Sequence, residues 1–106
     1  MATPSILGQG VTSGTNTFVL VDGPCVISTL FVCNAAGASR TFNIQARRSG
    51  EETSPSTNQQ YLYKANSLAS AETAAITGGI ALGDGETLLV SGSASDIAFT
   101  AFGVRT

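Results

Sequence analysis

The sequence has few charged residues and no histidine or tryptophan. Charged residues make up 11% of its 106 positions, against about 25% in an average soluble domain. Histidine is the most frequent general base and a frequent metal ligand, so its absence removes the usual centre of acid–base and metal chemistry. The chain also lacks phosphate-loop, serine-nucleophile and paired-cysteine motifs. We therefore expect a protein that is not an enzyme and has no catalytic, cofactor-binding or metal-binding residues.

Other missing features exclude two classes of partner. The net charge is −2, and Arg47-Arg48 is the only basic pair, so no basic stripe is present to neutralise the phosphates of a nucleic acid. No apolar run approaches the roughly 20 residues that span a bilayer. The segment Met1 to Gly10 lacks the basic start and apolar stretch of a secretory signal. We expect neither nucleic-acid binding nor membrane insertion.

The sequence contains only two cysteines, Cys25 and Cys33. If both lie in one strand, they are about 26 Å apart, whereas a disulfide requires Cα atoms within about 7 Å. We expect them to be buried free thiols, as suits synthesis in a reducing cytoplasm.

The longest apolar run is Cys25–Asn34, which is rich in β-branched and aromatic residues. We predict that it forms a central strand with both faces covered. The predicted faces are Cys25, Ile27, Phe31 and Cys33 on one side, and Val26, Leu30 and Val32 on the other.

A second strand is predicted over Arg40–Arg48, where apolar and polar residues alternate. Its buried side would carry Phe42, Ile44 and Ala46, and its polar side Asn43, Gln45 and Arg47. Further short strands are predicted at residues 17–21, 60–65, 72–76, 86–91 and 97–104, with Gly78-Gly79 ending the segment before it.

Seven to eight short strands separated by turn signals indicate an all-β fold, an antiparallel β-sandwich or jelly roll. We expect an N-terminal arm or edge strand over residues 1–14 and a single β-sandwich domain over residues 15–106.

The low charge and the mean hydropathy of +0.23 indicate that other subunits cover part of the surface. The alternative is a monomer coated with Ser, Thr and Asn. The arm Met1–Gly14 and the polar loop Ser49–Asn58 are expected to supply contacts. The residues that we predict as partner contacts are Ile6, Leu7, Arg47, Arg48, Glu51, Glu52, Tyr61 and Tyr63.

Several of these residues have more than one interpretation. Glu51 and Glu52 lie beside Arg47 and Arg48, and form either a solvated charge cluster or an ion-pair patch between subunits. Tyr61 and Tyr63 share a predicted strand face, where they either pack or contact a carbohydrate or protein. Acidic residues in neighbouring turns usually bond nearby backbone, and calcium binding is the alternative. These acidic residues are Asp84, Glu86 and Asp96.

From about Phe18 to Val104, the order of segments resembles small virion structural proteins of tailed bacteriophages, including phages of cyanobacteria. The segments that carry the resemblance are Ile27-Ser28-Thr29-Leu30-Phe31-Val32-Cys33-Asn34, Thr41-Phe42-Asn43-Ile44, Tyr61-Leu62, Ile80-Ala81-Leu82-Gly83 and Ile97-Ala98-Phe99-Thr100-Ala101-Phe102-Gly103-Val104. Residues 1–15 have no counterpart. The resemblance implies a component of the particle, without catalytic residues to transfer.

The sequence therefore predicts a non-enzymatic virion protein, assembled in the host cytoplasm, that decorates or cements the capsid through contacts with the major capsid protein. A symmetric homo-oligomer, with a trimer favoured, would multiply weak contacts. One alternative is a tail, neck, baseplate or fibre-associated structural protein. Another is a carbohydrate- or ligand-binding module.

Overall fold

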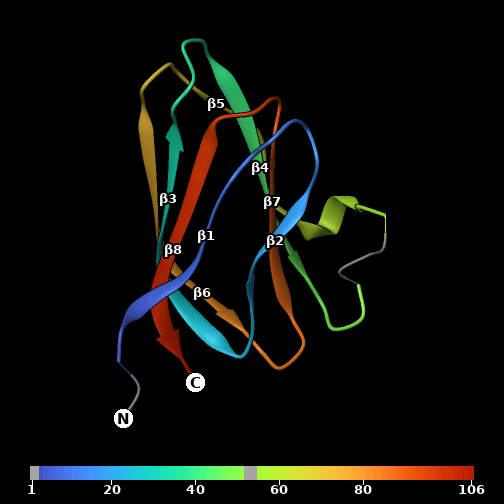
Figure 1. Cartoon of the computed structure of the whole chain (residues 1–106). Helices are drawn as coiled ribbons and strands as arrows, with labels where there is room; N and C mark the ends of the chain where they lie inside the picture. Colours follow the sequence, from blue (N-terminus) through green and yellow to red (C-terminus); the bar gives the residue numbers. More distant parts are fainter. Residues whose placement is uncertain (1–2, 52–54) are drawn as a thin grey trace.

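The computed structural model describes residues 3–51 and 55–106. Within them, eight strands form two antiparallel four-stranded sheets that pack face to face (Figure 1). The prediction of an all-β sandwich is confirmed. The elements are β1 (Ser5–Val11), β2 (Phe18–Asp22), β3 (Cys25–Asn34), β4 (Arg40–Arg47), the 3₁₀ turn η1 (Asn58–Gln60), β5 (Tyr61–Leu68), β6 (Thr73–Leu82), β7 (Thr87–Gly92) and β8 (Ile97–Arg105).

The strand order is that of a jelly roll. Sheet A has the order β1-β8-β3-β6, and sheet B has the order β2-β7-β4-β5. The first strand pairs with the last, β2 with β7, β3 with β6, and β4 with β5, as in one long hairpin rolled on itself. This nesting leaves β1 and β6 as the edges of sheet A, and β2 and β5 as the edges of sheet B.

The hydrophobic core lies between the two sheets and is centred on aromatic residues. Phe99 of β8 is fully buried, and its ring makes edge contacts with Phe18 of β2 and Phe42 of β4 at centroid distances of 6.3 and 6.4 Å. These rings therefore join both sheets through one cluster. The rest of the buried core comes from Leu20, Val21, Cys25, Ile27, Leu30, Val32, Ile44, Leu68, Leu82, Leu88, Val90, Ile97 and Ala101.

The predicted faces of the central strand are wrong, because β3 contains a bulge. Its pairing with β8 and β6 shifts between Ile27 and Thr29, and one extra residue reverses which side chains face inward. Consequently Leu30 lies in the core on the same side as Ile27, whereas Phe31 is exposed. Among residues 3–51 and 55–106, other segments cover only one face of β3.

Strand β6 is longer than the sequence predicted. Gly78 and Gly79 do not end it; they lie inside the strand opposite the bulge of β3, with φ angles of +120° and +80°. Residues with side chains rarely adopt these angles, so glycine allows the strand to shift register without stopping.

The N-terminal segment is an edge strand of sheet A from Ser5 onward, paired with β8. Leu7 packs against the core. Thr12 follows β1 and exchanges hydrogen bonds with Ile97, and its hydroxyl donates to the carbonyl of Ala94. The segment from Ser5 to Val11 is therefore part of sheet A and not a separate arm.

Candidate functional site: the outer face of sheet A

The outer face of sheet A is a broad apolar surface that nothing in the described chain covers. Because one face of β3 points into the core, its other side chains point outward, and those of β1, β6 and β8 continue the surface on both sides. We call this surface the apolar face. Its outward apolar side chains include Ile6, Val11, Val26, Phe31, Cys33, Ala75, Ala81, Ala98, Phe102 and Val104, and its outward polar side chains, all uncharged, include Gln9, Ser28, Thr29, Thr73, Thr77 and Thr100.

Large apolar side chains are concentrated on this face. Among the described residues, six large hydrophobic side chains are exposed, and the four on the apolar face have exposed fractions of 39 to 57%. These four are Ile6, Val11, Val26 and Phe31. At the middle of the face, the ring of Phe31 meets that of Phe102 edge to face at 5.8 Å between centroids. The bulge in β3 thus exposes an aromatic residue that the sequence placed inside.

The apolar face is also without charge. The four strands of sheet A contain one charged residue, Arg105 at the end of β8. Its guanidinium lies 3.4 Å from the carboxylate of Asp22, which is the last residue of β2 in sheet B. Uncharged, partly aromatic patches of this kind are typical of subunit interfaces rather than of solvated surfaces.

The outer face of sheet B is different, because the segment after β4 contacts it. Gln45 and Arg47 point outward from β4 and are nevertheless buried. The guanidinium of Arg47 donates hydrogen bonds to the Gln45 side-chain oxygen, the Glu51 carbonyl and the Ser56 hydroxyl at 2.8 to 3.1 Å. The predicted alternation of β4 is confirmed, but its polar side is covered by the chain itself. Arg47 therefore holds the loop, and we remove it from the proposed contacts with a partner.

The remaining predicted contact residues on the loop side are only partly brought together. Arg48 and Glu51 form an exposed ion pair with 3.9 Å between Nε and Oε2, and the Glu51 carboxylate also accepts a hydrogen bond from the Arg48 backbone. This is the predicted charge cluster at the end of β4, and whether it meets another subunit stays a prediction. Glu52 lies outside the described residues.

Tyr61 and Tyr63 do not share a face. A register shift in β5 places Tyr63 opposite the inward-pointing Ile44 and Tyr61 opposite the outward-pointing Gln45. Tyr63 accordingly packs beside the core residue Phe42, with 6.2 Å between the two ring centroids. Tyr61 lies on the outer side, where the ammonium nitrogen of Lys64 is 5.0 Å from the centre of its ring. Both side chains are half-buried, but only Tyr61 lies on the outer side of sheet B.

The acidic turns are separated as well. Asp84 and Glu86 precede β7, and Asp96 follows it, so the two turns lie at opposite ends of this strand. The Glu86 carboxylate accepts a hydrogen bond from the Gly83 amide at 2.6 Å, which is a turn contact. In the described part of the chain, no group of three acidic or cysteine side chains is arranged to hold a metal ion.

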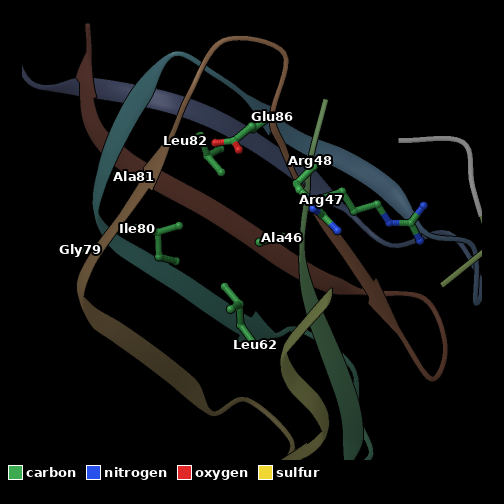
Figure 2. A pocket seen from close by; sticks show the side chains of 9 residues that line it. All are labelled: Ala46, Arg47, Arg48, Leu62, Gly79, Ile80, Ala81, Leu82 and Glu86. Carbon is green, nitrogen blue, oxygen red and sulfur yellow. The ribbon is translucent and has the colours of Figure 1, made fainter. Parts of the chain in front are cut away.

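A cleft of about 380 Å³ opens between the edges of the two sheets (Figure 2). Leu62 of β5, together with Ile80 and Leu82 of β6, points into it beside Ala46, and Glu86 lies at its rim. Neither tyrosine lines this cleft, nor do the aspartates of the two turns. Of the tyrosines and acidic turn residues considered for a binding site, only Glu86 lines this cleft, so these residues are not gathered around it.

The two cysteines are free, and they differ in environment. Cys25 points into the core and is buried, whereas Cys33 points outward onto the apolar face and is half-buried. Burial raises the pKa of the Cys25 thiol above its ordinary value of 9.0, and the nearby guanidinium of Arg105 opposes that shift only in part. The prediction that both thiols are unpaired is confirmed. The prediction that both are buried is confirmed for Cys25, whereas Cys33 is only half-buried.

We expect Cys33 to react with a thiol reagent well before Cys25, because the thiolate is the reactive form and must be accessible. Since the Cys25 pKa is raised, its reaction in the native state should accelerate only above the pH at which a free cysteine ionises. Alkylation rates over a pH series, followed by peptide mass spectrometry, measure both sites. Equal rates at the two sites in the folded chain at low protein concentration would contradict this placement.

Comparisons with family models, curated proteins and solved structures find no match to this chain. The described residues contain no helix long and apolar enough to cross a membrane.

Proposed function

We propose that this chain is a non-enzymatic structural protein of a bacteriophage virion, and that it decorates or cements the head through contacts with the major capsid protein. The observation that carries the proposal is the apolar face, four strands wide and without charge. A surface of this kind on a small domain is best explained by burial against other subunits in an assembly.

Two further points support a role in a particle. The jelly-roll strand order occurs in viral capsid proteins, although it also occurs in lectins, so it adds only an analogy of fold. The resemblance of segments between Phe18 and Val104 to phage virion proteins is independent of that analogy. Of the two, only the resemblance favours a building block over a binding module.

The two sides of the sandwich suit two kinds of contact. The apolar face fits association between small subunits, whereas exposed polar and charged groups lie on the loop side, where contacts with the capsid protein would be made. These groups are Arg48, Glu51, Tyr61 and Lys64. Such a domain adds contacts on both sides and thereby reinforces the particle surface.

The copy number of the chain in purified particles tests the proposal. Quantitative mass spectrometry against the major capsid protein should give a ratio near parity, as a head decoration protein requires. A ratio of a few copies to each hundred capsid proteins would contradict the head position and favour the tail, neck, baseplate or fibre instead. Absence from the particles would overturn the structural role altogether.

A further inference from the structure

We infer that the apolar face is a self-association surface, through which two copies of this chain pack sheet against sheet about a two-fold axis. The inference goes beyond the proposed function, because self-association is a property of the purified chain and does not depend on a particle.

Charge favours a second copy as the occupant. Two identical surfaces meet without repulsion only if neither carries an unbalanced charge at the contact. The apolar face meets this condition, since its strands have no charged residue apart from Arg105 at one end, and the whole chain has a net charge of only −2. No ion-pairing group on the face would select a charged partner over another copy.

The area of the face is sufficient for a dimer. Nine residues of β8 at about 3.3 Å each, and four strands about 4.8 Å apart, give a surface of roughly 20 by 30 Å. Packing two such faces in full overlap would bury about 1,200 Å² in total, which reaches the lower limit for specific protein interfaces. Elsewhere on the described chain, the exposed large hydrophobic side chains are Val19 and Leu62 alone.

The shape of the face determines the symmetry. When the same face of two identical chains packs against itself, the contact is isologous and requires a two-fold axis. A trimer, which the sequence analysis favoured, would instead need two different complementary surfaces on each subunit. In the two-fold arrangement, Phe31 and Phe102 lie near the centre of the interface, where aromatic residues contribute most to binding.

A matched pair of valines tests the inference. Val26 lies on the apolar face with 41% of its surface exposed, and Val19 lies on the outer side of sheet B with 45% exposed. Both side chains reach solvent in the single chain, so aspartate is tolerated at either site. In the dimer, Val26→Asp buries two carboxylates, which should raise the dimer dissociation constant at least about a hundredfold.

Sedimentation equilibrium of the purified chain over a range of concentrations measures the effect. The wild-type chain and Val19→Asp should approach twice the chain mass of 10.7 kDa, while Val26→Asp and Val26→Lys stay monomeric with unchanged circular dichroism. A monomeric wild-type chain at every concentration would overturn the inference, and so would Val19→Asp dissociating the dimer as strongly as Val26→Asp. A stable trimer would contradict the two-fold packing.

Discussion

Phe99→Ala is expected to lower the free energy of unfolding by about 3–5 kcal/mol, as truncating a fully buried phenylalanine usually does. Phe99 has no exposed surface, and its ring touches Phe18 and Phe42 of the opposite sheet. Removing it leaves a cavity at the point where the two sheets are joined. Since small domains have a total stability of roughly 5–15 kcal/mol, this variant should be close to unfolding.

Phe102→Ala is the matched control, because it truncates the same residue type three positions later in β8. Phe102 lies half-buried on the apolar face and touches Phe31 only from outside the core. Its loss should cost about 1 kcal/mol in the single chain, mostly from the lost ring contact. Urea denaturation of both variants at low protein concentration gives the comparison. Equal losses would show that the core is not organised around Phe99.

Arg47→Met is expected to cost about 2–4 kcal/mol, since methionine keeps most of the length of the side chain but none of its donors. The Gln45 oxygen would lose two hydrogen bonds from the guanidinium, and the Glu51 carbonyl and the Ser56 hydroxyl would each lose one. These groups are held by Arg47 against the outer side of sheet B. The variant should therefore release the loop and also expose the sheet beneath it.

Arg48→Met provides the control for charge, because it removes the neighbouring arginine whose ion pair with Glu51 is exposed. Exposed pairs of this kind contribute about 0–1 kcal/mol. Thermal unfolding reports the stability of each variant, and the trypsin cleavage rate after Arg48 in Arg47→Met reports release of the loop. If Arg47→Met were no less stable than Arg48→Met, and no faster to cleave than wild type, Arg47 would not anchor this loop.

Local patterns predicted most of the strands, because alternation and turn residues act over a few positions. The alternation of Phe42 and Ile44 with Gln45 placed β4 correctly, and Cys25–Asn34 was assigned its full length. The predicted faces of β3 are wrong beyond Ser28, because the bulge there adds one residue to the strand. No change in the character of the sequence signals this bulge. One residue decided whether Phe31 was assigned to the core or to the surface.

The candidate site was harder to predict than the fold, because it depends on contacts between distant segments. The burial of Arg47 results from a loop that folds back onto sheet B, and the opposite orientations of Tyr61 and Tyr63 result from a shift in pairing with β4. Ile6 was predicted as a partner contact from the sequence alone, and this stays a prediction; the surface to which it belongs is assembled from four strands that are separated in the chain. Low charge indicated that such a surface exists; only the strand order shows where it lies.

Alkylation of Cys33 in the native chain tests most directly whether the apolar face is covered by a second copy. This thiol lies on the face itself, and the buried Cys25 serves as an internal reference for unfolding. We expect the alkylation rate of Cys33 to fall as protein concentration rises, and to stay high at every concentration in Val26→Asp. A wild-type rate that is independent of concentration, across a range in which the chain assembles, would show that assembly uses another surface and would contradict this account.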